Sequence, residues 1–291
     1  MSILPSLVTK PDIEYELVDA ADIGDVQQPL TVLQRLSASD GFRRLCILVA
    51  LGLIWELYAR WVDNPLILPT LSDTLVTFVS DLKSGVLLDR IGTSVRSLLL
   101  GYAAGLLLAT VFTTIAVSTR LGSDLLSTLT AMFNPVPAIA LLPLALIWFG
   151  LGTPSLVFVI IHSVLWAVAL NTLTGFRSVP AVLRMSGRNY GLQGVRYVAL
   201  ILIPAAFPSI LAGLKIGWAF AWRTLIAAEL VFGVSSRSGG LGWYIFEARA
   251  ELETSRVFAG LLAVILIGLT VEAVIFRFIE KHSVQRWGMQ L

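Results

Sequence analysis

The stretch VFAGLLAVILIGLTVEAVIFRFI, residues 257–279, is 23 residues long and carries only two charged side chains. A helix needs about 20 mostly apolar residues to cross the hydrocarbon core of a bilayer, within a range of about 17–25. Five further stretches have a similar length and character, and they are residues 42–61, 93–117, 124–149, 154–174 and 204–230. This pattern predicts an all-α polytopic membrane protein with about six spanning helices.

The composition of the whole chain supports a membrane protein. The 291 residues are 56% hydrophobic and 14% charged, whereas a soluble domain has about 25% charged residues. A net charge of +2 is too small to indicate a nucleic-acid partner. The single cysteine excludes an intramolecular disulfide, and two histidines speak against a metal site built from several histidines. We therefore expect no metal site in this chain.

The third predicted span is interrupted by prolines. Residues 124–149 contain Asn134, Pro135, Pro137 and Pro143. Proline removes a helix hydrogen bond and its ring clashes with the preceding turn, so we expect this span to be bent or broken.

The sequence predicts five parts along the chain and an orientation in the membrane. We expect an acidic N-terminal arm at 1–41, a first transmembrane helix at 42–64, an external connecting segment at 65–92, a core transmembrane domain at 93–280 and a tail at 281–291. Twelve Lys and Arg residues fall in the pieces expected inside and seven in those expected outside, which predicts that both termini are cytosolic. The arm, with a net charge of −5, is either a partly disordered extension or a docking arm for a partner.

An expected external segment begins with GGLGWY, residues 239–244. We interpret the glycines as shaping a turn into a short interfacial segment. Its aromatic residues Trp243, Tyr244 and Phe246 would then lie at the level of the lipid headgroups.

The longest expected cytosolic connection, residues 176–203, is basic and contains the sequence RNYGLQGVRYVALILIP at 188–204. Residues 179–191 predict a short helix that ends at Gly191. Ser186 and Gly187 are small, which would let another surface approach the backbone closely. The simplest alternative is a basic loop held at anionic lipid.

The spacing in this loop resembles that of ABC-importer permeases, whose pattern is Glu-Ala-Ala, three residues, Gly, nine residues, Ile, one residue and Leu-Pro. Met185, Ser186 and Gly187 occupy the first three positions, so an ion pair formed by the family's Glu is not expected. Ile203 stands in place of Leu. In that family the loop forms a coupling helix that seats in a groove of a cytosolic ATPase. The resemblance assigns ATPase coupling to Met185, Ser186, Gly187, Arg188, Gly191, Ile201 and Pro204.

Residues 68–102, 134–155 and 222–245 look like stretches of permeases for nitrate, sulfonate, taurine and bicarbonate, and the likeness covers about residues 42–288. It implies the type I ABC importer permease fold in a bacterial inner membrane. It also implies a second permease copy, two cytosolic ABC ATPase subunits and an extracytoplasmic solute-binding protein as partners. We find no Gly-Lys-Thr/Ser phosphate loop and no catalytic triad. This chain is therefore expected to be no enzyme and to bind no cofactor, with ATP and Mg used by the partner ATPase.

Arg223 lies deep in the fifth span. An ionisable side chain at mid-bilayer costs about 2.5–3.5 kcal/mol on insertion scales and is a functional hypothesis by default. It could attract an anionic solute, or it could form a structural ion pair with Glu272 of the sixth span. The candidate residues of the translocation pathway are Arg223, Trp222, Glu229, Asn134, Pro135 and Pro137, although a structural role is the other interpretation of Glu229.

Two other functional classes stay open at this point. An ion-driven secondary transporter often has internal repeats and mid-membrane acidic residues, and we find no convincing repeat. A polytopic membrane enzyme would need carboxylates or histidines clustered at one depth, and the spans offer only Glu229, Glu272 and His162. The simplest interpretation of His162 is a buried imidazole whose ring nitrogens have hydrogen-bond partners within the protein. A requirement of uptake for ATP and a partner ATPase would separate an importer from both alternatives.

Overall fold

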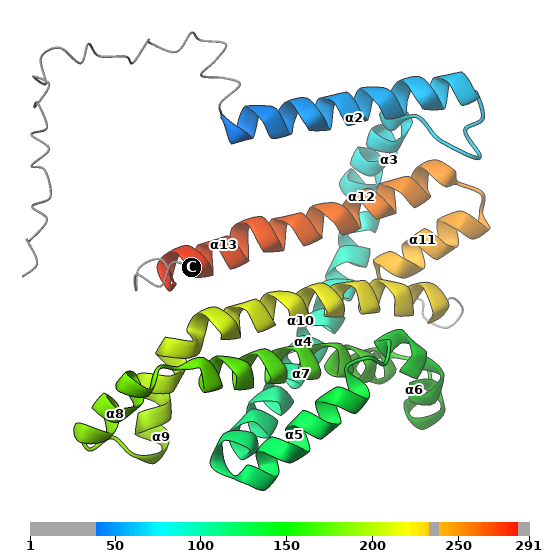
Figure 1. Cartoon of the computed structure of the whole chain (residues 1–291). Helices are drawn as coiled ribbons and strands as arrows, with labels where there is room; N and C mark the ends of the chain where they lie inside the picture. Colours follow the sequence, from blue (N-terminus) through cyan, green and yellow to red (C-terminus); the bar gives the residue numbers. More distant parts are fainter. Residues whose placement is uncertain (1–38, 233–238, 285–291) are drawn as a thin grey trace, which may run out of the picture. The chain divides into compact units, whose positions relative to one another are not determined.

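The computed structural model describes residues 39–232 and 239–284, and these ranges are helical without a strand (Figure 1). Within these ranges, five helical stretches are long and apolar enough to cross a membrane: Gly41–Val62, Val86–Ser118, Thr153–Ser178, Val198–Val231 and Thr254–His282. A sixth span is formed if the pair Arg120–Phe133 and Ala138–Phe149, bent by 88°, counts as one. The protein is thus an all-α polytopic membrane protein, and its third predicted span is broken.

The elements follow one another in a simple order. The first half comprises α2 (Asp40–Val62), α3 (Leu71–Lys83), α4 (Val86–Ser118), α5 (Arg120–Phe133), the 3₁₀ turn η1 (Ala138–Leu141), α6 (Leu142–Phe149) and α7 (Thr153–Ser178). The second half comprises α8 (Ala181–Asn189), α9 (Gly194–Tyr197), the π-helical stretch η2 (Val198–Leu202), α10 (Ile203–Phe232), α11 (Leu241–Ala250), α12 (Thr254–Thr270), a second π-helical stretch η3 (Val271–Phe276) and α13 (Arg277–His282).

The chain divides into two units, residues 1–54 and 55–291. Most of the expected acidic arm and most of the expected tail lie outside the described residues. All packing discussed below lies within the second unit.

The expected connecting segment at 65–92 is largely helical, because it contains α3 and the start of α4. Thr70 caps α3, because its hydroxyl accepts a hydrogen bond of 3.0 Å from the Asp73 backbone N–H. Gly85 has a φ of +85°, a conformation that favours glycine and lets α4 begin at Val86 directly after α3. Helix α4 is therefore longer than the predicted span, which started at residue 93.

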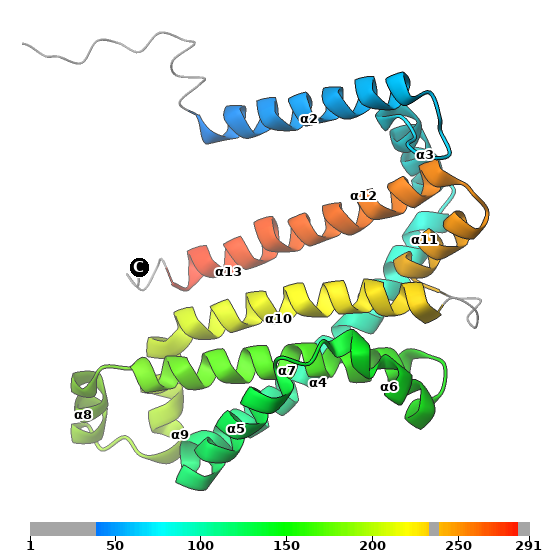
Figure 2. The same cartoon turned by 45° about the vertical axis from the view of Figure 1, so that its right-hand side comes forward.

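Helices α4, α7 and α10 form the centre of the second unit, and Figures 1 and 2 both show α7 alongside α10. Small residues allow α4 and α7 to pack closely. A Cβ atom on Gly101 would lie 2.6 Å from Ile160, and one on Gly105 would lie 2.7 Å from Val164. Larger residues at these positions would separate α4 from α7, as expected for helix pairs in membranes.

The aromatic residues of α11 have different surroundings. Tyr244 is buried, and its hydroxyl donates a hydrogen bond of 2.6 Å to Asp81 of α3. Burial raises the pKa of the Tyr244 phenol and the Asp81 carboxylate adds to this, so the phenol stays a donor at neutral pH. Tyr244 therefore packs inside the protein and does not present its ring to the surface. Trp243 and Phe246 are partly buried, with their rings stacked at 5.4 Å.

Candidate functional site

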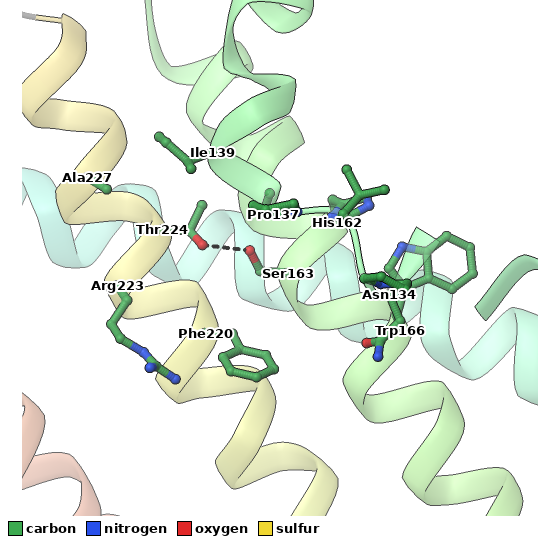
Figure 3. A pocket seen from close by; sticks show the side chains of 13 residues that line it. Asn134, Pro137, Ile139, His162, Ser163, Trp166, Phe220, Arg223, Thr224 and Ala227 are labelled. Atoms are coloured by element: carbon green, nitrogen blue, oxygen red, sulfur yellow. Dashed lines mark hydrogen bonds between the residues drawn. The ribbon is translucent and has the colours of Figure 1, made fainter. Parts of the chain in front are cut away.

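A cavity of about 370 Å³ lies where the broken span meets α7 and α10 (Figure 3). Its volume is within the range of small-molecule sites in proteins, about 300–1,000 Å³. The cavity is lined by Asn134, Pro135, Val136, Pro137, Ala138, Ile139, His162, Ser163, Trp166, Phe220, Arg223, Thr224 and Ala227.

The break in the third span supplies one wall. Helix α5 ends at Phe133, and the chain continues through Asn134 and Pro135 to Pro137, which precedes η1. Neither proline has an N–H to continue a helical ladder, and the two halves diverge by 88°. All three candidate pathway residues of this segment, Asn134, Pro135 and Pro137, are in the cavity lining.

Arg223 contributes the cavity's positive charge from α10. Its Nε donates a hydrogen bond of 3.1 Å to the Ala219 carbonyl, and its guanidinium carbon lies 5.0 Å from the centre of the Phe220 ring. Among the described residues, no carboxylate forms an ion pair with Arg223. Glu272, the partner considered from the sequence, is exposed. The guanidinium group of Arg223 thus contacts the Ala219 carbonyl and the Phe220 ring, and no acidic group of the described chain neutralises its charge.

The opposite side of the cavity is aromatic. Figure 3 shows His162 and Trp166 of α7 near Asn134, away from Arg223. The Trp166 ring stacks on Phe133 at 5.5 Å and meets His162 edge-on at 6.2 Å. The Nε2 atom of His162 is buried and has no hydrogen-bond partner in the described ranges, so the expectation of a satisfied imidazole is wrong for this nitrogen.

Two hydroxyl groups join the helices that line the cavity. Ser163 of α7 and Thr224 of α10 share a hydrogen bond of 2.9 Å, drawn as a dashed line in Figure 3. Little in the sequence distinguishes these two residues, because hydroxyl side chains occur throughout the spans. Phe220 could have been found, since it precedes Arg223 by three residues and shares its helix face.

Trp222 and Glu229, also predicted as pathway residues, do not line this cavity. Trp222 is buried, and its Nε1 donates to the Val264 carbonyl at 3.3 Å. Glu229 is 4% exposed, and its carboxylate accepts hydrogen bonds of 2.8 Å from the Ser94 hydroxyl and from the Gly242 N–H. Helix geometry explains the difference, because each residue rotates the side-chain direction by about 100°. A neighbour of Arg223, or a residue six positions away, therefore lies on another face.

The cavity as a whole is suited to a small anion. It combines one guanidinium group with hydroxyl, amide and aromatic groups, and none of the described residues that line it is acidic. A guanidinium group presents several N–H donors in a planar fork that matches oxoanions. The apolar remainder of the lining offers contact to a hydrocarbon portion of a solute.

The predicted loop helix is present as α8, and the structure gives its residues different environments. Gly187 is buried, and a Cβ atom there would lie 2.9 Å from Ile201 and 3.2 Å from the Tyr197 ring. Its small size therefore serves packing within this chain, which corrects the idea that it makes room for an outside surface. Gly191 has a φ of +73°, as expected for a glycine that ends a helix. Pro204 is the second residue of α10.

The outer face of α8 is apolar and exposed. Val182 is 69% exposed and Met185 56%, and Tyr190, directly after the helix, is 86% exposed. Ser186 and Arg188 are also exposed. A cluster of large apolar side chains on a nine-residue helix is typical of a surface that another protein or a membrane covers.

Comparison with known proteins gives consistent matches. Residues 98–283 match the family described as "Binding-protein-dependent transport system inner membrane component". The chain is 31% identical over 241 residues to a putative ABC transporter permease protein of Methanocaldococcus jannaschii, covering 81% of this chain and 89% of that protein. It is 30% identical over 222 residues to a putative aliphatic sulfonates transport permease protein of Escherichia coli, covering 76% and 82%. It is 29% identical over 192 residues to a nitrate import permease protein of Synechocystis, covering 66% and 68%.

Proposed function

Because the chain belongs to the family of inner-membrane components of binding-protein-dependent transport systems, we propose that its Arg223 cavity lies on the translocation pathway for a small anionic solute. The chain is the permease subunit of an ABC importer. This membership favours an ATP-driven importer over the ion-driven transporter and membrane enzyme considered from the sequence.

The observation that carries the proposal is the unneutralised charge of Arg223 inside an apolar span. A cation at mid-membrane costs about 2.5–3.5 kcal/mol on insertion scales. No carboxylate of the described chain offsets this cost, whereas the adjoining cavity has room for an anion. A passing anion would be attracted by this charge.

The solute class follows from the cavity and the relatives together. Two of the relatives are named for aliphatic sulfonates and for nitrate, both of which are oxoanions. The lining pairs the guanidinium group with apolar and aromatic walls in about 370 Å³. We therefore propose an oxoanion as the solute, with a short alkanesulfonate as the class that uses both the charge and the apolar walls.

The partners follow from the family and from α8. Two copies of this chain would form one pathway, an extracytoplasmic solute-binding protein would deliver the solute, and two cytosolic ATPase subunits would dock below. The exposed apolar face of α8 supports its role as the docking helix. The complex would lie in the plasma membrane, with both termini of this chain in the cytosol. ATP and Mg would bind to the ATPase subunits and not to this chain.

The test is uptake into proteoliposomes that contain the assembled complex and its binding protein, with ATP inside and no ion gradient. Replacement of Arg223 by Gln removes the charge and leaves a shorter, polar side chain, and we expect uptake of a labelled alkanesulfonate to fall at least tenfold. Arg223→Lys should retain part of it. The matched control is Arg96→Gln, which removes an exposed Arg of α4 outside the cavity lining. Unchanged uptake in Arg223→Gln would contradict the pathway role.

A further inference from the structure

The end of α7 is held by a residue from the next helix. The last carbonyl groups of an α-helix have no partner within the helix and need other donors. Arg184 of α8 supplies them: its Nη2 donates to the Phe176 carbonyl and, at 3.3 Å, to the Arg177 carbonyl. Its Nε donates to the Val179 carbonyl at 3.1 Å. A cation at this position also complements the negative end of the helix dipole.

The face of α8 that carries Arg184 has a second contact with the rest of the chain. Gly187 lies three residues after Arg184 and therefore on the same side of the helix. It packs against Ile201 of η2 and Tyr197 of α9. The opposite face stays exposed, so α8 has one side joined to the transmembrane helices and the other side available to a partner.

The helix end that Arg184 holds is itself joined to α10. A Cβ atom on Gly175 of α7 would lie 2.6 Å from the Cβ of Ser209 of α10. Beside this contact, Phe176, Val179, Leu202 and Ala206 form a small buried cluster. About 20 Å further along α7, at a rise of 1.5 Å per residue, lies Ser163, which contacts α10 again in the cavity wall.

We propose that Arg184 is the positioning residue through which a displacement of α8 reaches α7 and the cavity. Its guanidinium group bonds three carbonyls at once, so α8 cannot tilt without pulling the end of α7. Without Arg184, α8 keeps its exposed face and its Gly187 contact, but its polar attachment to α7 is lost. The outcome is a complex that binds its ATPase and transmits movement poorly. This inference rests on the proposed function, because it assumes that the ATPase docks on α8.

The test compares three variants in the reconstituted complex with its ATPase and binding protein. Arg184→Met keeps an unbranched side chain, although a shorter one, and removes every side-chain hydrogen bond, and Arg184→Lys keeps the charge and one donor group. Arg196→Met is the matched control, because Arg196 is an exposed Arg of the same loop for which the structure shows no side-chain hydrogen bond or ion pair. Two quantities are measured, the ATPase that co-purifies with the permease and the number of solute molecules imported per ATP hydrolysed.

We expect Arg184→Met to co-purify its ATPase within twofold of the wild type and to import at least tenfold less solute per ATP. Arg184→Lys should be intermediate, and Arg196→Met should match the wild type. Hydrogen exchange of the isolated permease should show faster exchange in α8 and in the last turn of α7 for Arg184→Met, with the rest of α7 unchanged.

Wild-type import per ATP in Arg184→Met, or an equal loss in Arg196→Met, would overturn the proposal. If Arg184→Met does not assemble, wild-type import per ATP in Arg184→Lys would overturn it in the same way. Failure of the proposed function has a different signature, because the wild-type complex itself would then bind no ATPase or would import solute without ATP.

Discussion

Replacement of Glu229 by Ala tests whether this buried carboxylate is structural or belongs to the pathway. The Glu229 carboxylate accepts hydrogen bonds of 2.8 Å from the Ser94 hydroxyl and from the Gly242 N–H. The Ala variant leaves both donors buried without an acceptor, at a cost of about 1–3 kcal/mol each. We therefore expect the free energy of unfolding to fall by about 2–6 kcal/mol.

Thermal unfolding of the permease in detergent measures this loss. A change of 1 kcal/mol shifts Tm by about 2–4 °C for domains of 150–250 residues, so Glu229→Ala should lower Tm by at least about 4 °C. Glu229→Gln keeps one acceptor oxygen and should lower Tm less. The control is Glu272→Ala, which removes an exposed carboxylate from another span and should leave Tm within about 1 °C. A wild-type Tm in Glu229→Ala combined with lost uptake would refute the structural role and restore Glu229 to the pathway.

Three further outcomes are expected. In Gly242→Ala the new Cβ would lie 2.7 Å from a backbone oxygen of α10, so Tm should fall by several degrees, whereas Gly92→Ala, with nothing within 4 Å, should not lower it. In Gly187→Trp the ring cannot fit against its neighbours in α9 and η2, so α8 should lose its protection in hydrogen exchange while the protein still inserts. A reporter fused after Leu291 should be active in the cytosol and one inserted after Ser238 outside; a cytosolic signal at Ser238, which lies outside the described residues, would contradict the predicted topology.

The spans were predictable because each depends on a single physical requirement, an apolar length that matches the bilayer. The break at residues 134–137 was predictable for a similar reason, since two prolines within four residues cannot continue a helix. The same local argument placed a glycine with positive φ at Gly191, where the structure has a φ of +73°.

The partners of polar side chains were not predictable, because they depend on which helices meet. Glu229 and Arg223 are both ionisable residues of one span, and nothing local distinguishes them. Their difference arises from Ser94, 135 residues away in the sequence, and Gly242, 13 residues away, both of which bond Glu229. The role of Gly187 was misjudged for the same reason, since small size is visible in a sequence but the neighbour it accommodates is not.

The bend in the third span has a consequence for how the protein is made. Helix α5 has 14 residues and α6 has 8, so α5 is only about 21 Å long and α6 shorter still, against a hydrocarbon core of about 30 Å. Neither half is long enough to cross a bilayer alone. The backbone polar groups at the bend must also be kept away from lipid, where they would have no hydrogen-bond partner. Helix α7, which packs against α5, η1 and α6, is synthesised after them. We therefore expect the third span and α7 to enter the lipid together during biosynthesis.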